Sequence, residues 1–439
     1  MSGADVGLLS VVLILALIYS GLYVPVALGL VSFLGVWLIR GNLDHPVSML
    51  SLAAADSISH STFAVVPLFA LMGLLVSIAG LGRDVYEVAN YAFRKVRGGL
   101  GIATVAANAV FAAITGSSIA SASVFTKVSV PEMRHFGYHA RFTVGVVAGS
   151  SVLGMLIPPS VMLILYAIIT EQSVGHLFIA GVIPGIVLAI AYGIAIVVMA
   201  HVFPNFVGGQ EYRLESEDGS GRLTPWQILV KVFPIVLLIG LVLGGIYTGW
   251  FTPTEAGAAG ALAALIIAVV KRQLSLSGLW KVLVETGYIT STILLLLIAA
   301  SMYSRMLGIA GLPTLFGDWM QAQAFGFYSI IALYVLILLM MGTILDTVSI
   351  ILIIVPLFLP LLEPYDINLI WFGIVTVVGA EIGLLTPPLG ISCFTIHSTL
   401  NDPTISLFDI FTGAFPFAVI MLLVLIALIA FPAMSLILL

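Results

Sequence analysis

The sequence is poor in charge and in cysteine. Only 8% of its 439 residues are charged and 61% are hydrophobic, whereas a soluble domain carries about 25% charged residues. This composition excludes a water-soluble fold. The net charge of -5 contains no basic block, so nucleic acid is not an expected partner. Because Cys393 is the single cysteine, an intrachain disulfide cannot form and a cysteine-ligated metal site is not expected.

The sequence also lacks the motifs of ATP-driven and hydrolytic proteins. It contains no Gly-x-x-x-x-Gly-Lys-Ser/Thr loop and no Gly-x-Ser-x-Gly motif, which would mark an ATP site or an activated serine. We therefore predict that the protein is not an enzyme and that it binds no organic cofactor.

Long hydrophobic runs recur from the N-terminus to the last residue. About 20 apolar residues in a helix cross a bilayer core of about 30 Å. The first run, Val6–Ile39, is longer than one upright span, and Gly21 with Pro25 offers a break. One tilted helix and two shorter helices both fit, so the side of the N-terminus stays open. The run lacks the basic region and cleavage site of a signal peptide.

Further simple spans are predicted at Thr62–Leu81, Leu177–Phe203, Ile228–Ile246, Ala256–Val270, Val282–Ser304 and from Gly413 onward.

One apolar segment, Gly98–Val130, is interrupted by the polar sequence Thr115–Ser118. Basic residues flank it on both sides, and by the positive-inside rule both ends lie in the cytoplasm. The segment is therefore predicted to enter the membrane, turn at its polar tip and leave on the same side, as a re-entrant helical hairpin. The flanking residues are Arg83, Arg94, Lys95 and Arg97 before it and Arg134, His135, His139 and Arg141 after it.

A second segment, Gly326–Leu362, is interrupted in the same way at Gly342–Thr347. It is flanked by Asp318, Glu363 and Asp366 and by no Lys or Arg, so both of its ends are predicted to lie outside. Non-helical backbone at membrane depth must be buried in protein or face water. Each tip is therefore predicted to line a cavity.

Each hairpin is followed by a span with a double proline, which begins at Pro158 in the first case and at Pro387 in the second. Gly116 precedes Pro158 by 42 positions, and Gly342 precedes Pro387 by 45. This near-equal spacing predicts an internal repeat. Because the hairpins open to opposite sides, the two copies are predicted to be inverted, as is typical of secondary transporters.

Short motifs run through the whole chain in a fixed order. They are Pro67-Leu68-Phe69, Gly116-Ser117-Ser118, Pro131-Glu132-Met133 with Gly137-Tyr138, Ile157-Pro158-Pro159-Ser160, Leu177-Phe178 through Gly181 to Pro184-Gly185, Pro253-Thr254-Glu255-Ala256, Gly342 with Asp346, and Thr386-Pro387-Pro388. In this order they resemble the large membrane subunit of the tripartite ATP-independent periplasmic (TRAP) transporters. The chain departs from that family at Leu74-Leu75, where a polar residue is common.

The resemblance implies a scaffold domain, a transport domain with an elevator-type motion, and sodium ions near the two hairpin tips. It also implies two protein partners, a small four-helix membrane subunit and a soluble periplasmic protein that delivers the substrate, usually an organic acid. The implied location is the inner (cytoplasmic) membrane of a bacterium or archaeon, with several passes through the lipid bilayer.

The predicted fold class is an all-α integral membrane protein with inverted repeats, each built from a re-entrant helical hairpin and a broken helix, similar to the elevator folds of the ion-transporter superfamily. Its predicted parts are scaffold helices at 1–97 and 226–320, a first repeat at 98–203, a polar loop at 204–225 and a second repeat at 321–439.

Sodium is a hard cation that prefers oxygen ligands, and both tips offer hydroxyl groups and freed carbonyls. We predict two cation sites, each shared between a hairpin tip and the broken helix of the same half. The candidate sodium ligands are Ser117, Ser150, Ser151 and Gly154 in the first half and Gly342, Thr343, Asp346, Thr347, Gly383 and Thr386 in the second. For Ser117 and Ser118, close helix packing is the alternative role.

Two carboxylates lie in the second repeat. Asp346 is the strongest cation ligand, because an unpaired carboxylate deep in a membrane is costly and no Lys or Arg lies within twenty residues of it. The alternative is an Asp that caps the return helix. Glu381 precedes the second break and fits a structural hydrogen-bonding partner best, with a second ligand or a proton carrier as alternatives.

An anionic substrate group suits the tips, because half-helices point positive N-terminal dipoles at the midplane. Lys127 is predicted to anchor the first hairpin at the basic side. Arg305 is predicted to lie at the outer interface; if it faces a cavity instead, a substrate carboxylate is its natural partner. The candidate substrate-binding residues are Ser117, Ser118, Ser160 and Thr386.

We therefore expect sodium-coupled uptake of a small organic acid, such as a dicarboxylate or sialic acid. Sodium serves as the coupling ion, and a periplasmic substrate-binding protein delivers the acid. The closest alternative is a proton-coupled organic anion carrier that uses Asp346 and Glu381. A channel is a weaker alternative, because channels do not need inverted broken helices.

Overall fold

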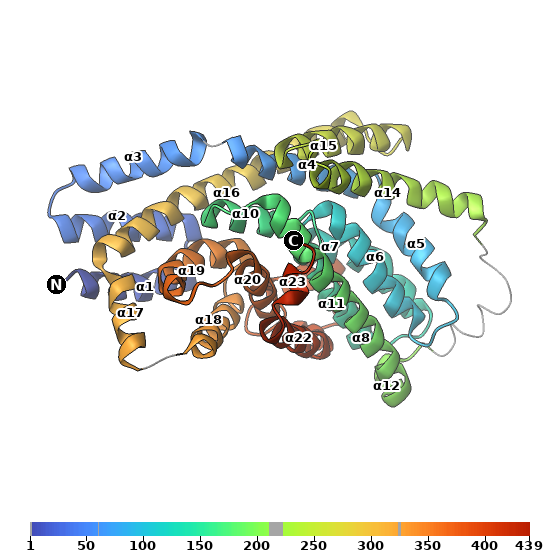
Figure 1. Ribbon diagram of the computed structural model, residues 1–439. Helices are drawn as coiled ribbons and strands as arrows, with labels where there is room; N and C mark the ends of the chain where they lie inside the picture. The colour runs from blue at the N-terminus through green and yellow to red at the C-terminus, as the bar shows by residue number, and fades with distance from the viewer. Residues whose placement is uncertain (1, 60, 210–222, 324–325) are drawn as a thin grey trace.

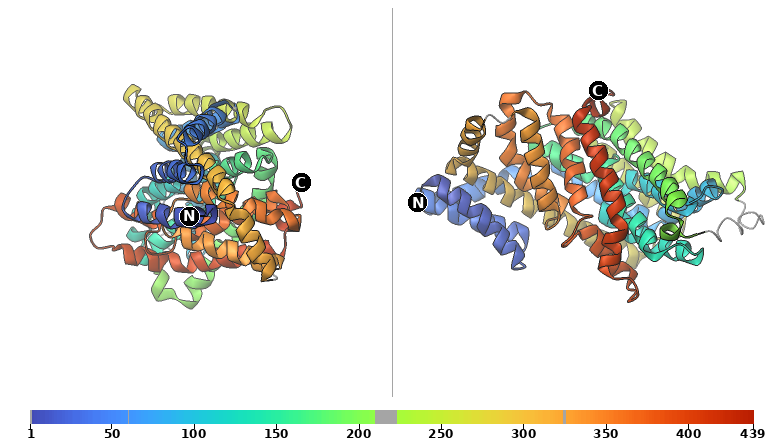
Figure 2. Two further views of the ribbon diagram at one scale, coloured as in Figure 1. Left: turned by 90° about the vertical axis from the view of Figure 1, so that its left-hand side faces the viewer. Right: turned by 90° about the horizontal axis from the view of Figure 1, so that it is seen from below.

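The computed structural model describes residues 2–59, 61–209, 223–323 and 326–439, and nearly all of them lie in helices. The molecule is elongated, with the N-terminus at one end and the C-terminus near the middle of its long dimension (Figures 1 and 2). Most of the predicted polar loop at 204–225 falls outside the described residues. The all-helical fold class is confirmed.

The first run of apolar sequence forms two helices rather than one. Gly21 adopts a positive φ of 92° between them, and Pro25 falls in the first turn of the second helix, where a proline costs no hydrogen bond. The helices of this first part are α1 Gly3–Tyr19, α2 Val24–Arg40, α3 Asp44–Ser59, the 3-10 helix η1 Ser61–Ala64, α4 Val65–Ile78 and α5 Leu81–Phe93.

The first repeat contains the predicted hairpin and the predicted broken helix. Its helices are α6 Gly99–Thr115, α7 Ser118–His135, α8 Ala140–Ser151, α9 Leu153–Leu156, α10 Val161–Thr170 and α11 Val174–Val202, followed by the short α12 Pro204–Val207. The two sides of the break, Ala140–Leu156 and Val161–Thr170, are bent by 41°.

The second half follows the same order. Its scaffold helices are α14 Pro225–Tyr247, α15 Pro253–Val270, α16 Leu276–Ala310 and α17 Leu312–Ala322. Its repeat consists of α18 Phe327–Gly342, α19 Thr347–Leu362, the 3-10 helix η3 Glu363–Tyr365, α20 Leu369–Gly383, α21 Ile391–Leu400, α22 Leu407–Ala430 and the short α23 Ala433–Leu436.

Two predicted spans need correction. The span predicted at Thr62–Leu81 ends at Ile78, where the chain bends by 62° into α5. The span predicted at Val282–Ser304 extends to Ala310. Helices α3, α5 and α17 were not predicted, because they are too polar or too short to read as spans.

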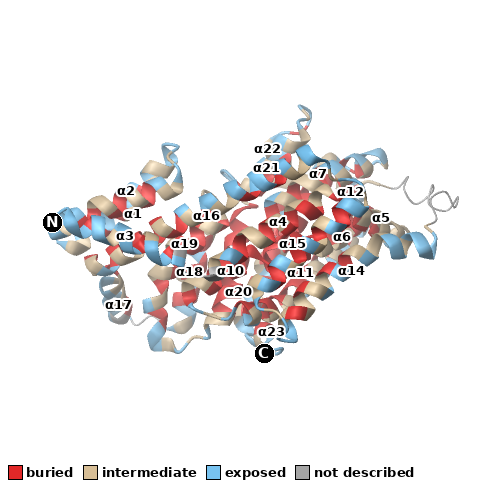
Figure 3. Ribbon diagram, turned by 90° about the horizontal axis from the view of Figure 1, so that it is seen from above, coloured by how far each residue is buried: buried red, intermediate tan, exposed pale blue. Residues whose placement is uncertain are grey.

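The buried residues gather where the two halves meet. Figure 3 shows them around α4, α15, α10, α20 and α11, whereas exposed residues dominate at the ends of the molecule. Small residues bring the scaffold helices together: Gly260 of α15 lies against the Met72 sulfur of α4 and against Val242 of α14. Close approach through glycine is the usual packing mode of membrane helices.

Both ends of the first hairpin lie at the C-terminal end of α11. Gly98, just before the hairpin, lies against Ile196 near the end of α11. Tyr138, just after the hairpin, pairs in an isolated bridge with Gly208, beyond that helix. The prediction that this segment returns to the side from which it enters is therefore confirmed.

The second hairpin enters from the opposite end. Phe327, at its start, stacks on Trp371, which follows its end, with ring centroids 6.0 Å apart. The Trp371 indole donates a hydrogen bond of 2.9 Å to the Leu428 carbonyl at the C-terminal end of α22. The N-terminal end of α22 lies beside the first hairpin, because Arg141 and Asp409 form an ion pair of 2.7 Å there. The two repeats are thus inverted relative to each other.

A second ion pair strengthens this contact between the repeats. Arg134, at the end of α7, lies 2.6 Å from Asp402 in the turn between α21 and α22. Hydrogen bonds from Thr404 and from Arg134 hold the pKa of Asp402 below its ordinary value. The carboxylate is therefore ionised at neutral pH and available to the guanidinium.

Helices α8 and α22 cross at two glycines. A Cβ added to Gly413 would overlap the carbonyl oxygen of Arg141, and one added to Gly145 would overlap the carbonyl oxygen of Gly413. Only glycine lets the two backbones approach this closely.

We predict that Gly413→Ala lowers the free energy of unfolding by roughly 1–3 kcal/mol, the cost of overpacking a tight contact. The matched control is Gly193→Ala in α11, where an added Cβ meets nothing within 4 Å. Thermal unfolding in detergent checks both. Equal midpoints for the two variants would show that the crossing tolerates a side chain.

Candidate functional site

The tip of the first hairpin is built around Gly116. Helix α6 ends at Thr115, and Gly116 turns the chain with a positive φ of 58°. Ser117 then caps α7, because its hydroxyl oxygen accepts a hydrogen bond of 3.3 Å from the Ala120 amide. The turn thus satisfies two backbone groups beside the interruption: the Ala120 amide, which donates to Ser117, and the Ala112 carbonyl, which accepts from the Gly116 amide.

This first tip rests on the first helix break. A Cβ on Gly116 would lie 2.8 Å from the Pro159 carbonyl oxygen, and a Cβ on Gly154 would lie 3.1 Å from the Ser117 carbonyl. Ser160 caps α10 by accepting from the Leu163 amide at 3.3 Å and donates to the Met155 carbonyl before the break. Tip and break therefore form one packed unit.

The scaffold reaches this tip through α4. A Cβ on Gly73 would lie 3.0 Å from the Thr115 carbonyl oxygen. The neighbouring pair Leu74-Leu75 is the place where the chain departs from the family pattern, so the departure lies beside the tip.

The tip of the second hairpin carries an acidic cap. Helix α18 ends at Gly342, and Asp346 caps α19 by accepting hydrogen bonds from the amide, at 3.2 Å, and from the hydroxyl group of Ser349. The capping role that was the alternative for Asp346 is therefore present. A carboxylate with two oxygens keeps further lone pairs after accepting these bonds.

The second tip rests on the second helix break in the same manner as the first. A Cβ on Gly342 would lie 2.7 Å from the Gly383 Cα. The Leu389 amide, past the double proline, donates a hydrogen bond of 3.2 Å to the Thr343 carbonyl. Gly154 and Gly383 both stand four residues before their double prolines, so the two contacts occupy equivalent positions of the repeat.

A second pair of contacts joins each hairpin to its broken helix. Asn108 of α6 donates a hydrogen bond of 2.6 Å to Ser150 of α8. Tyr334 of α18 and Thr376 of α20 share one of 2.8 Å. The partners are 42 residues apart in both repeats. Sequence reasoning missed Asn108, Tyr334 and Thr376, although their equal distance from the tip glycines was a usable signal.

The two tips meet at Glu381. This residue of α20 is fully buried, and its Oε1 accepts a hydrogen bond of 2.7 Å from the Thr347 hydroxyl group at the second tip. The Ser118 side chain of the first tip lies beside the same carboxyl group but makes no hydrogen bond to it. The hydrogen bond from Thr347 is the kind of contact that the structural role favoured for Glu381 requires.

The predicted oxygen ligands gather at the two tips, and their hydroxyl groups donate mainly to nearby backbone carbonyls. Ser151 donates to Ala148 at 2.8 Å, Thr343 to Met340 at 2.8 Å and Thr386 to Gly383 at 2.8 Å. A hydroxyl that donates keeps lone pairs for a cation. Among the described residues, three or more His, Cys, Asp or Glu side chains nowhere form a metal cluster.

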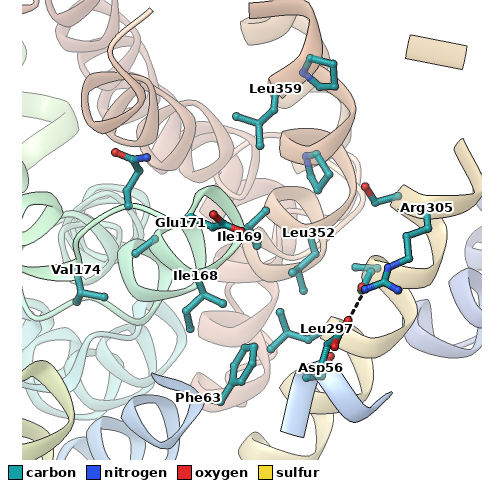
Figure 4. A pocket seen from close by; sticks show the side chains of 18 residues that line it. Asp56, Phe63, Ile168, Ile169, Glu171, Val174, Leu297, Arg305, Leu352 and Leu359 are labelled. Atoms are coloured by element: carbon teal, nitrogen blue, oxygen red, sulfur yellow. Dashed lines mark hydrogen bonds and ion pairs between the residues drawn. The ribbon is translucent and has the colours of Figure 1, made fainter. Parts of the chain in front are cut away.

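A separate cavity of 710 Å³ lies between α16 on one side and α10 and α19 on the other (Figure 4). Arg305 lines it and forms an ion pair with Asp56, and Glu171 lies nearby in the wall. Arg305 thus lines a cavity, which was the alternative considered for it, and its charge is already paired with Asp56; its position at the outer interface stays a prediction. The four candidate substrate-binding residues do not line this cavity.

Two oppositely oriented hairpins, each seated on a broken helix, define a multi-pass membrane transport protein. The fold is shared with a solved structure at low sequence identity: the Alcanivorax borkumensis YdaH transporter matches 90% of this chain and 90% of its own with a TM-score of 0.62 and 12% identity. That likeness concerns the fold.

Sequence comparison identifies the family. Residues 11–434 match the model of the tripartite ATP-independent periplasmic transporter, DctM component. The C4-dicarboxylate TRAP transporter large permease of Pseudomonas aeruginosa is 34% identical over 90% of both chains. The sialic acid TRAP transporter large permease of Vibrio cholerae is 29% identical over 97% of this chain and 96% of its own.

The chain therefore belongs to the DctM family of TRAP transporter large permeases, as its motifs predicted. It is a multi-pass inner-membrane permease and not an enzyme. Six helices are long and apolar enough to cross a membrane, or up to eight if each bent pair is one span, among the residues that the structure describes.

We predict that Gly116→Ala destabilises the protein more than Gly311→Ala. Both glycines have positive φ, 58° and 72°, so both substitutions carry the cost of about 1–2 kcal/mol for a left-handed residue. Only Gly116 also faces a neighbouring carbonyl, because a Cβ on Gly311 meets nothing within 4 Å. Thermal unfolding measures the difference, and equal midpoints would contradict the close fit of tip and break.

Proposed function

We propose that this chain carries out sodium-coupled uptake of a small organic acid. The proposal rests on one observation: each hairpin tip packs against the helix break of its own repeat, with hydroxyl and carbonyl oxygens on both sides of the contact. Such interrupted helices supply the oxygen ligands that coupling ions need near the midplane of a transporter.

The first proposed sodium site lies between the first tip and the first break. Ser117, Ser150, Ser151 and Gly154 would hold the ion. The Ser117 backbone lies against Gly154, and the hydroxyl groups of Ser150 and Ser151 donate to carbonyls one turn back in α8. Their oxygens are neutral, so this site depends on several weak ligands acting together.

The second proposed site contains a charged ligand. Asp346 would hold the ion together with oxygens of Gly342, Thr343, Thr347, Gly383 and Thr386. Gly342 and Gly383 are in backbone contact, and the Thr386 hydroxyl group lies 2.8 Å from the Gly383 carbonyl. A carboxylate at this depth gains from a bound cation, since no Lys or Arg lies near it in the sequence.

The substrate class follows from the relatives and from the electrostatics of the tips. Large permeases named for C4-dicarboxylates and for sialic acid match nearly the whole chain. The N-termini of α7, α10 and α19 begin at the tips and breaks, and their positive dipole ends suit a carboxylate. Ser117, Ser118, Ser160 and Thr386 are the proposed substrate contacts.

The proposed partners are those of the TRAP arrangement. A periplasmic substrate-binding protein would deliver the acid, and a small four-helix membrane subunit would stand beside the scaffold. Support comes from the family match and from the relatives, which are named large permeases of TRAP transporters.

An elevator-type motion is proposed between the scaffold (1–97 and 226–320) and the two repeats (98–203 and 321–439). A short amphipathic helix, α5 or α17, precedes each hairpin and can act as an arm. Helix α5 is tied to the scaffold, because Asp84 and Glu87 form ion pairs with Lys231 of α14, and Asp84 also pairs with Lys271 beyond α15. The repeats, in turn, are joined to each other through the crossing of α8 and α22.

Uptake by proteoliposomes tests the proposal. The chain is reconstituted with its small subunit and binding protein, and uptake of C4-dicarboxylates and sialic acid is followed with sodium or choline at fixed pH. We expect saturable uptake that stops when choline replaces sodium. Uptake that persists in choline and follows a proton gradient would favour the carrier that uses Asp346 and Glu381, and an unsaturable current would favour a channel.

Asp346→Asn separates the cation role from the capping role. Asn caps a helix about as well as Asp, so the variant should keep its unfolding temperature. It loses the charge, so we expect the sodium concentration for half-maximal uptake to rise about tenfold or more, the usual scale for losing a charged contact. Asp346→Ala, which removes both roles, is the comparison. Unchanged sodium dependence in Asp346→Asn would refute the cation role.

A further inference from the structure

Glu381 stands apart from every other ionisable residue of the chain. Among the residues that the structure describes, it is the one charged side chain that is fully buried. Its immediate neighbours on α20, Ala380 and Ile382, are apolar and buried. Burial of a carboxyl group is costly unless its oxygens are satisfied, so its contacts define its role.

One residue from each hairpin lies beside the carboxyl group. Thr347 lies at the N-terminus of α19 in the second repeat and donates to Oε1 at 2.7 Å. Ser118 lies at the N-terminus of α7 in the first repeat, beside the same carboxyl group but without a hydrogen bond to it. Both hairpin residues are themselves buried. One side chain therefore stands between the tips of the two inverted repeats.

The unpaired polar atoms beside Glu381 are complementary, since one is an acceptor and another can donate. Glu381 Oε2 and Ser118 Oγ are both buried, and neither has a hydrogen-bond partner. The Tyr192 hydroxyl group of α11 is also buried and also has none. A small shift of the first tip would pair Oε2 with Ser118 and satisfy both atoms, and buried polar atoms are rarely left unpaired.

The repeat offers no second copy of this contact. Glu381 stands six residues before Pro387, and the residue six before Pro158 is Val152, which is buried and apolar. A single carboxyl group therefore has to serve both hairpins.

We propose that Glu381 is a positioning residue that ties the two hairpin tips together through Thr347 and Ser118, so that order at either tip depends on the other. This role concerns the tips whether or not they bind sodium. It predicts that substitution of Glu381 loosens the first tip, which belongs to the other repeat, as well as the second tip.

Hydrogen exchange of the whole chain in lipid nanodiscs, without sodium, tests the tie. Glu381→Leu should raise exchange about tenfold, the scale for losing one buried hydrogen bond, at both 116–120 and 343–349. Glu381→Gln should stay close to the wild type, because an amide can accept from Thr347 and donate to Ser118. Thr376→Val is the matched control, since it removes another buried hydrogen bond from α20 without contact to either tip.

The outcomes are distinct. Unchanged exchange at 116–120 in Glu381→Leu, or an equal loss of protection in Glu381→Gln, would overturn the tie. If Glu381→Leu does not fold, Thr347→Val replaces it: faster exchange at 116–120, in the other hairpin, supports the tie, and exchange confined to 343–349 overturns it. Because the exchange experiment contains no sodium, its result does not depend on sodium coupling. A failure of sodium-coupled uptake and a failure of the tie between the tips can therefore be told apart.

Discussion

The structure depends on one constraint, which is that an interrupted helix inside a membrane must satisfy its free backbone groups within the protein. Both repeats meet it by placing a hairpin tip on a helix break. Gly116 fits against the Pro159 carbonyl, and Gly342 fits against Gly383. A side chain at any of these glycines would separate the two surfaces, so the same contact that closes the backbone also fixes the positions of the hydroxyl and carbonyl oxygens at the tips.

The two repeats pack across each other as well as within themselves. The glycine crossing of α8 and α22 joins them along the helices. The ion pairs of Arg134 with Asp402 and of Arg141 with Asp409 join them at the end of the first hairpin. Rigid packing of this kind suits the proposed motion of the two repeats as a single unit.

The hairpins, the breaks and their inversion could be predicted from the sequence, because each has a local signal. Polar residues inside an apolar run mark a tip, double prolines mark a break, and the sign of the flanking charges gives the orientation. Helices α5 and α17 had no such signal: they are 13 and 11 residues long and too short to cross a membrane. Their role depends on what they connect.

The candidate site could be predicted by residue type but not by contact. The oxygen-bearing residues at both tips follow from the motifs, whereas the pairing of Asn108 with Ser150 and the cavity at Arg305 depend on helix rotation. Rotation about a helix axis is invisible in a segment that is apolar on every face. For the same reason the sequence left two settings open for Arg305, since the end of an apolar run does not show which way its last residues point.

The position equivalent to Glu381 in the first repeat holds Val152, so the protein is two-fold in outline but not in chemistry. A molecule inserted in the opposite orientation would have a similar outline in the bilayer, but Glu381 would belong to the hairpin that opens to the other side. The two orientations in a bilayer are therefore chemically distinct, and vesicles with randomly inserted protein contain two different populations of it.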